Sequence, residues 1–150
     1  MIRVLLEGPI LTNSGYGEHT RLVYKSLSED KNVDIFVNPL SWGKTSWIPR
    51  VEDEFHLSVD LDVHKLQMYL EESKQKKDNM SFDIQILVGI PSEFTKKAPY
   101  SIVVTAGIET DRVSAEWLLR THKGIDKLIV PSDHARNGFV KTKYEVQNNK

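Results

Sequence analysis

Short runs of consecutive apolar residues recur along this chain, and most are separated by segments in which apolar residues return every three or four positions. Strands buried on both faces of a parallel sheet show continuous apolar runs, whereas the longer spacing is typical of amphipathic helices. The predicted strands cover residues 2–6, 33–37, 83–88, 101–105 and 127–130. The predicted helices cover residues 17–27, 61–77, 114–122 and 132–140.

The alternation of strands and helices predicts the fold class. Strand–helix–strand units joined by right-handed crossovers build a doubly wound, mainly parallel sheet. We therefore expect an α/β, Rossmann-like domain with about five or more strands flanked by helices. The domain is expected to span residues 1–140. Residues 141–150 are expected to form a polar tail, at which the chain looks cut off before a second domain.

Composition narrows the class of protein further. Of the 150 residues, 39% are hydrophobic and 27% are charged, and the formal net charge is -1. These values are ordinary for one globular domain, and a net charge near zero gives no overall positive potential that would attract nucleic acid. Cysteine is absent, which excludes disulfides and thiolate metal sites and fits a reducing, cytoplasmic location. No apolar run approaches the ~20 residues of a membrane span, and no His/Asp/Glu spacing resembles a metal site.

The first predicted strand leads through the sequence GPILTNSGYG, from Gly8 to Gly17, directly into the first predicted helix. In an open parallel sheet, ligands bind outside the carboxyl ends of the strands, where this turn lies. Gly15 and Gly17 would let the backbone approach a ligand, and the first N–H groups of a helix favour an anion such as phosphate. The alternative is that the glycines only permit a tight turn, and the motif alone does not decide between the two.

Better-known motifs do not fit. A P-loop requires a glycine five residues before Gly43, which opens the sequence GKT, and Asn38 stands there instead. A dinucleotide-binding fingerprint requires a third glycine where Thr20 stands, and an acidic residue where the second predicted strand is followed by Asn38-Pro39. The GxSxG turn of serine hydrolases is absent as well. These three classes of enzyme are therefore disfavoured.

Three segments carry a family resemblance. They are SGYGEHTRLVYKSL at residues 14–27, TAGIETDRVSAEWL at 105–118 and DKLIVPSDHARNGF at 126–139. Together they resemble the N-terminal domain of GT-B glycosyltransferases of family four, of the phage and bacterial variety, over about residues 2–140.

The resemblance implies one half of a two-domain enzyme. Such a retaining, metal-independent enzyme moves a sugar from a nucleotide-sugar to an acceptor, and its N-terminal half mainly binds the acceptor. The donor-binding half, with its Glu-x7-Glu motif, is expected to be missing here, because no two glutamates are eight residues apart.

Carried over onto matching positions, the resemblance implies that Gly15, Tyr16 and Gly17 match the glycine-rich loop that faces the donor diphosphate. His19, one turn into the helix, fits plain packing as well as contact with an anion or acceptor hydroxyl. Many family members place a histidine after the fourth strand, whereas this chain has Glu109, Thr110 and Asp111 there. Glu109 is therefore the preferred candidate catalytic residue, with Asp111 as the alternative, as a hydrogen-bond acceptor or base for an acceptor hydroxyl. A plain acidic turn that leads into a helix is the alternative.

Two further groups follow predicted strands at the same edge. Ser132 and His134 follow the fifth, where Ser132 is most simply a helix N-cap. Trp42 and Trp47 follow the second, and an aromatic face can stack on a sugar, although packing against the sheet explains a tryptophan equally well. Trp117 is predicted to lie in the core. The candidate acceptor- or diphosphate-binding residues are Ser14, Gly15, Tyr16, Gly17, His19, Trp42, Thr110, Asp111, Ser132 and His134.

The expected partners follow from this interpretation. They are a nucleotide-sugar, a glycan or other acceptor, and the missing C-terminal domain, with no metal, no other cofactor and no direct nucleic-acid contact. An isolated half would expose the apolar face that its partner domain covers, which predicts a dimer through that face. The alternative function is a non-catalytic Rossmann-like module that binds a ligand or a protein.

Overall fold

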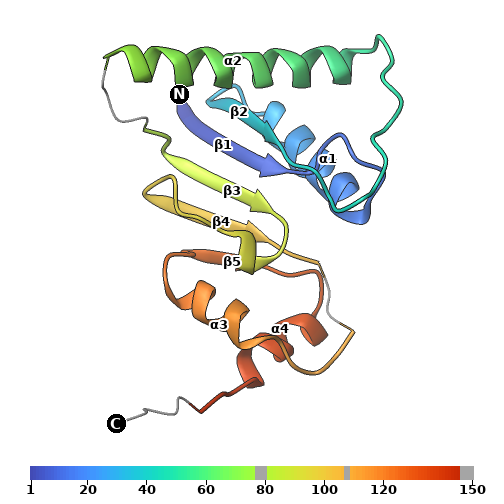
Figure 1. Ribbon diagram of the computed structural model, residues 1–150, viewed down its shortest axis with the longest axis vertical. Helices are drawn as coiled ribbons and strands as arrows, with labels where there is room; N and C mark the ends of the chain where they lie inside the picture. The colour runs from blue at the N-terminus through green and yellow to red at the C-terminus, as the bar shows by residue number, and fades with distance from the viewer. Residues whose placement is uncertain (77–80, 107–108, 146–150) are drawn as a thin grey trace.

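The computed structural model describes residues 1–76, 81–106 and 109–145 (Figure 1). The strands are β1 (Ile2–Gly8), β2 (Val33–Pro39), β3 (Ile84–Val88), β4 (Tyr100–Val104) and β5 (Lys127–Ile129). The helices are α1 (Gly15–Ser28), α2 (Glu54–Lys76), α3 (Ala115–His122), α4 (Asp133–Lys141) and the short 3-10 helix η1 (Pro91–Glu93). The strands run parallel in the order β2-β1-β3-β4-β5, which confirms the predicted α/β, doubly wound, Rossmann-like fold.

The strand order reverses beside β1, because the chain leaves β1 for β2 on one side and returns to β3 on the other. In sheets of this kind, ligands bind at such a switch point, outside the carboxyl ends of the strands. β1 and β2 pair along their whole length, from Ile2 opposite Val33 to Gly8 opposite Pro39. The turns after β1 and β2 therefore leave the sheet at the same level, at the edge where a ligand is expected.

The predicted strand boundaries lie within two residues of the observed ones, but two predictions about helices are wrong. α2 begins at Glu54 rather than at residue 61. Its first turns carry Leu57 and Leu61 outward, 59% and 70% exposed, so the amphipathic pattern is obscured there. The predicted last residue of that helix, 77, lies outside the described residues. Trp117 was predicted in the core but is only half-buried, and it stacks on Phe139 with ring centroids 6.0 Å apart.

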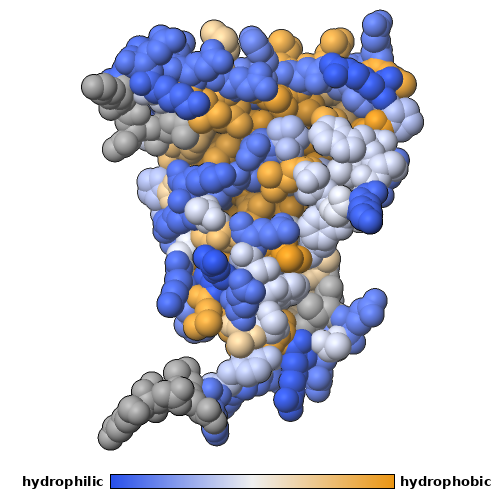
Figure 2. Space-filling view, viewed as in Figure 1, coloured by the Kyte–Doolittle hydropathy of each residue, from blue (hydrophilic) through white to orange (hydrophobic). Residues whose placement is uncertain are grey.

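α1 and α2 cover different parts of the sheet. One core cluster joins α1 and the first turns of α2 to one face and includes Leu6, Tyr24, Val37, Val59 and Val88. The second half of α2 packs on the other face, in a cluster of Leu5, Phe36, Leu66, Phe82 and Ala98. Figure 2 shows mainly polar side chains on the outer surface of α2, with a few apolar ones among them, and apolar side chains gathered beneath the helix. Neither α2 nor another helix of the described residues has the length and hydropathy to cross a bilayer.

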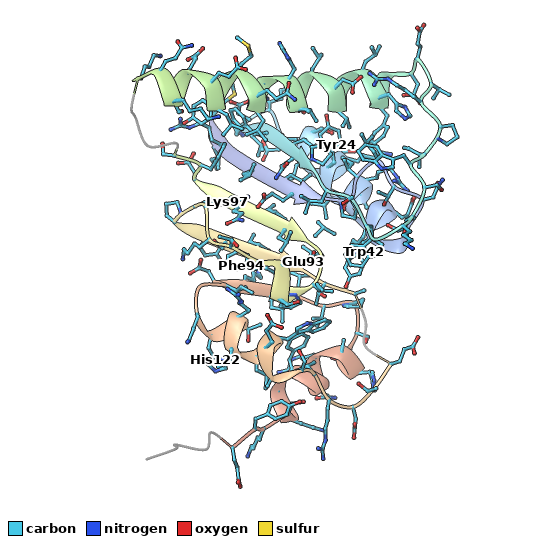
Figure 3. The ribbon with its side chains drawn as sticks, in the orientation of Figure 1. Tyr24, Trp42, Glu93, Phe94, Lys97 and His122 are labelled. Atoms are coloured by element: carbon cyan, nitrogen blue, oxygen red, sulfur yellow. The ribbon has the colours of Figure 1, made fainter. Side chains whose placement is uncertain are left out.

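Tyr24 joins α1 to α2 through polar contacts (Figure 3). Its hydroxyl shares a hydrogen bond with Ser58 and donates one to Asp62 at 2.8 Å. Lys65 in turn donates to Asp62 at 2.8 Å and to Asp34 of β2 at 2.7 Å. Burial is the main reason why the pKa of Tyr24 rises to about 12. Burial alone would lower the pKa of Lys65, but the hydrogen bonds to Asp34 and Asp62 outweigh it and raise that pKa.

A buried carboxylate fixes the connection between β3 and β4, which holds η1 in place of an α-helix. Glu7 is 4% exposed and accepts hydrogen bonds from Asn38 at 2.8 Å and Gln85 at 2.7 Å, while Lys97 supplies the opposite charge. Gln85 also donates to the Thr95 carbonyl at 2.8 Å and accepts from the Lys97 N–H at 2.7 Å. The charge of Glu7 is thus paired and hydrogen-bonded, as a buried charge must be.

The predicted polar tail begins inside α4, whose last residue is Lys141. The Thr142 hydroxyl accepts a hydrogen bond from the Val113 N–H at 3.2 Å, and the Tyr144 hydroxyl donates to the Val113 carbonyl at 2.6 Å. Residues 146–150 lie outside the described residues. The first part of the tail therefore packs back on the segment that leads into α3.

Alkaline pH is expected to weaken this fold through Tyr24. Its pKa is about 10 in an unfolded chain and about 12 in the folded protein, so the unfolded chain loses the phenolic proton first. The resulting stabilisation is complete below pH ~10 and is lost as pH rises towards ~12. In denaturant titrations across this range, the free energy of unfolding of Tyr24→Phe should fall less steeply than that of the parent protein. Tyr100→Phe, at an exposed tyrosine, is the control, and equal slopes for all three proteins would contradict the prediction.

Candidate functional site

The turn between β1 and α1 is crowded at Gly17. A Cβ atom added to Gly17 would lie 2.3 Å from the Thr12 carbonyl oxygen and 2.8 Å from the Pro9 carbonyl oxygen. A side chain does not fit at these distances, so this close approach requires glycine. Arg21 of α1 donates hydrogen bonds to the carbonyls of Ile10 and Thr12, at 2.8 and 3.0 Å, and holds the turn against the helix.

Ser14 caps α1 from within this turn. Its hydroxyl accepts a hydrogen bond from the Gly17 N–H at 2.9 Å, and its carbonyl accepts one from the Glu18 N–H at 2.9 Å. The bond to Glu18 is the first regular bond of the helix, so Ser14 satisfies one of the free N–H groups of the first turn, that of Gly17. Gly15 is exposed and has open space where a side chain would be, so a ligand can reach the backbone there.

Tyr16 brings the loops of the carboxyl edge together. Its hydroxyl lies 3.1 Å from the Thr105 hydroxyl and accepts a hydrogen bond from the Ala106 N–H at 3.1 Å, just after β4. Its ring centroid lies 4.3 Å from that of Trp42, which follows β2 (Figure 3). The predicted residues Tyr16 and Trp42 are thus in contact. The turn after β1 and the loops after β2 and β4 share one surface.

The connection from β2 to α2 runs along the same turn. Thr12 and Trp47 form an isolated antiparallel bridge. Beside it, the Asn13 N–H donates to the Ser46 carbonyl at 2.8 Å. Trp47 is 52% exposed and Trp42 is half-buried, so the two tryptophans of this loop differ in their surroundings. Trp42 packs on Tyr16, whereas the Trp47 side chain projects largely into solvent.

A second group of predicted residues lies where the loop after β4 meets α4. His134 donates a hydrogen bond from Nε2 to the Thr110 carbonyl at 3.2 Å. The Ser132 hydroxyl accepts one from the Ala135 N–H at 3.1 Å, so Ser132 is the N-cap of α4. Asp111 and His134 also line a cavity of about 420 Å³, which we call the α4 groove. Its lining residues are Asp111, Arg112, His134, Asn137, Gly138 and Lys141.

The other two predicted residues stand apart from these groups. Glu109 is exposed in the loop after β4, and within the described residues its side chain forms no ion pair or hydrogen bond. The two residues that precede it in the quoted segment, 107–108, lie outside the described residues. His19 is half-buried on α1, and its ring makes no hydrogen bond to another described residue.

A second cavity, of about 410 Å³, lies at the start of α2 and was missed by the sequence analysis. Its lining residues are Arg50, Val51, Glu52, His56, Leu57 and Asp60. Arg50 forms an ion pair with Asp60. Asp53 bonds with the His56 ring at 2.7 Å, and the hydrogen bond from the His56 N–H holds the pKa of Asp53 below its usual value. Arg50, Asp60 and one ring nitrogen of His56 are therefore already partnered, whereas Glu52 forms no ion pair within the described residues and the buried Nε2 of His56 has no hydrogen-bond partner there.

Some residues of the site could have been found from sequence and others could not. Thr105 is a polar residue at the end of a buried strand, at the edge where ligands bind, and this signal was available. Asn137 and Lys141 share one side of α4 with His134, at helical spacing. That spacing indicates a binding groove only when Arg112 is known to line the same cavity beside α4. No three His, Cys, Asp or Glu side chains gather as metal ligands within the described part of the chain.

The fold and the edge at Tyr16 define an α/β protein with a Rossmann-like parallel sheet. No protein-family model, no curated protein and no solved structure matches this chain. The case for a particular function therefore rests on the residues of this chain and on the resemblance of its three segments.

The crowding at Gly17, compared with the open space at Gly15, predicts effects of different size for alanine substitutions at these two glycines. Gly17→Ala is expected to lower the free energy of unfolding by about 1–3 kcal/mol, because the new methyl group must displace the Thr12 backbone. Gly15→Ala meets open space and should change the stability by less than about 1 kcal/mol. Denaturant titration of both variants is the measurement. Equal losses of stability at the two positions would contradict this account of the turn.

The contact between Tyr16 and the loop after β4 can be tested by amide hydrogen exchange. Tyr16→Phe keeps the ring against Trp42 but leaves the Ala106 N–H without its acceptor. Loss of this hydrogen bond should cost about 1 kcal/mol. We expect faster exchange at Ala106, with the amides of β2 unchanged as the internal control. Unchanged protection at Ala106 would show that Tyr16 does not hold this loop.

Proposed function

We propose that this chain is the N-terminal, acceptor-side half of a retaining, metal-independent glycosyltransferase, which transfers a sugar from a nucleotide-sugar to an acceptor. The observation that supports it most strongly is the set of contacts at Tyr16. They bring the loop after β2 together with two of the segments that resemble family-four enzymes, those after β1 and β4. One shared surface at the carboxyl edge is what a substrate-binding cleft requires.

In this proposal, Tyr16 and Trp42 form an aromatic shelf for the acceptor sugar. Their rings are in contact and both are half-buried, so they are held in place yet accessible from one side. Aromatic rings bury a large apolar area at little entropic cost, which suits the C–H face of a sugar. The Thr105 hydroxyl lies beside the shelf, within hydrogen-bond distance of Tyr16, and because Thr105 is fully buried it holds the Tyr16 hydroxyl in place rather than contacting a sugar.

Glu109 has the chemistry to act on the acceptor. An exposed carboxylate in the loop after β4 can accept a hydrogen bond from an acceptor hydroxyl and take up its proton as the sugar is transferred. The first turn of α1 would face the donor diphosphate. Because Ser14 already satisfies the Gly17 N–H, this turn offers only part of the charge stabilisation, and we assign the rest to the donor-binding half.

The same turn favours a second candidate function, a non-catalytic module that binds a ligand or a protein. Arg21, the basic side chain nearest the turn in sequence, is committed to the carbonyls of Ile10 and Thr12. Arg21 also forms an ion pair with Glu18 at 2.8 Å, so this arginine adds little positive charge for a diphosphate at the helix end. A binding module needs no such charge, and it would still use the aromatic shelf.

Saccharide binding to the chain tests the aromatic shelf. In saturation-transfer NMR with a panel of oligosaccharides, Trp42→Ala should weaken binding about five- to tenfold, since a stacked ring contributes roughly 1 kcal/mol. Trp42→Phe should keep part of the affinity, and Trp47→Ala, on the same loop, is the matched control. Absence of binding by every saccharide, or equal losses at both tryptophans, would overturn the shelf. Binding of a peptide or of a ligand without a sugar, at the same residues, would favour the second candidate.

A further inference from the structure

We propose that the α4 groove binds an oxyanion, a phosphate or carboxylate group, carried by the acceptor substrate. This inference rests on the proposed function and names the chemical class of the acceptor. Donors dominate the lining: the guanidinium of Arg112, the ammonium of Lys141 and the amide of Asn137, whereas the His134 ring already donates from Nε2 to the Thr110 carbonyl. Asp111 is the single carboxylate in the lining. A planar guanidinium beside an ammonium group suits the several acceptor oxygens of a phosphate or carboxylate.

The two cations of the groove are not neutralised by the protein. Within the described residues, neither Arg112 nor Lys141 takes part in an ion pair. Arg50 in the other cavity provides the comparison, because it pairs with Asp60. Unpaired cations that line a concave surface focus positive potential into it, whereas a paired cation does so weakly.

Hydrogen bonds hold the groove open at both ends. At the first turn of α4, His134 donates to the Thr110 carbonyl at 3.2 Å. Beyond the last turn, Thr142 accepts from the Val113 N–H at 3.2 Å, and Tyr144 donates to the Val113 carbonyl at 2.6 Å. The loop that carries Asp111 and Arg112 is thereby fixed along α4. A preformed site loses less entropy when a ligand binds, so its affinity for that ligand is higher than that of a groove that must first become ordered.

The groove and the aromatic shelf can hold parts of one molecule. The loop after β4 reaches the shelf at Ala106 and the groove at Asp111. Five residues of chain span at most ~18 Å, so the two places lie within the length of a short phosphorylated or carboxylated oligosaccharide. A sugar on the shelf and its anionic group in the groove would orient the acceptor beside Glu109, which lies between them in sequence.

The test is a titration of the isotope-labelled chain followed by amide and side-chain NMR. The probes are inorganic phosphate, maltotriose 1-phosphate and maltotriose, because a trisaccharide is long enough to reach from the groove towards the shelf. We expect saturable shifts with phosphate at residues 110–113 and 134–141, and tighter binding of maltotriose 1-phosphate than of either other probe. Arg112→Gln and Lys141→Gln should each weaken phosphate binding about five- to tenfold. Asp111→Asn should strengthen it, because it removes a like charge. Arg50→Gln, at the paired cation of the other cavity, is the control and should have no effect.

The outcomes separate this inference from the proposed function. Phosphate shifts that are absent from the groove, or unchanged in both Arg112→Gln and Lys141→Gln, would overturn the anion site. Maltotriose 1-phosphate that binds no more tightly than phosphate would overturn the assignment of the groove to a sugar acceptor. Phosphate binding in the groove without any saccharide at Trp42 would leave the anion site standing while the glycosyltransferase role fails.

Discussion

The carboxyl edge depends on how closely α1 approaches the end of β1. A Cβ atom at Gly8 would lie 2.6 Å from the Thr20 hydroxyl, and one at Gly17 would lie 2.3 Å from the Thr12 carbonyl oxygen. Two glycines on opposite sides of one turn thus let a helix and a strand meet without side chains between them. Tyr16 sits next to the tighter of the two contacts, and only this approach brings its hydroxyl to the end of β4. Any larger residue would push α1 outward and separate the loops of the edge.

Most of the fold could be predicted because buried parallel strands are continuous apolar runs, a signal that is local in sequence. The failures have a common physical reason. The predicted start of α2 is too late because Leu57 and Leu61 face outward and obscure the apolar stripe in its first turns. A pattern of apolar residues does not say which of them face a sheet. Trp117 was placed in the core by its residue type alone. It instead lies between α3 and α4, against Phe139, in a contact that depends on the helix that follows β5.

The candidate site divides in the same way. The serine caps at Ser14 and Ser132 and the glycine turn are local features, and they could be found from sequence. The partners that give the site its shape are distant: Tyr16 and Thr105 are 89 residues apart, and Thr110 and His134 are 24 apart. No pattern within one segment encodes such pairs. Arg112 and Lys141 were passed over for this reason, since each is an ordinary surface cation until the groove is seen.

The buried hydrogen-bond network around Glu7 also influences how the chain runs near the carboxyl edge of the sheet. A buried carboxylate paired with a lysine adds little net stability, because the loss of hydration offsets the attraction. Its effect is on where the chain runs. The Gln85 amide bonds to the backbone of Thr95 and Lys97 as a neighbouring strand would, and Phe94 then fills the apolar face above Leu87. The β3–β4 connection can therefore pack flat on the sheet with three residues of η1 and no crossover helix. Because no helix follows the end of β3, nothing stands between Tyr16 and the loop after β4, and the two are in contact.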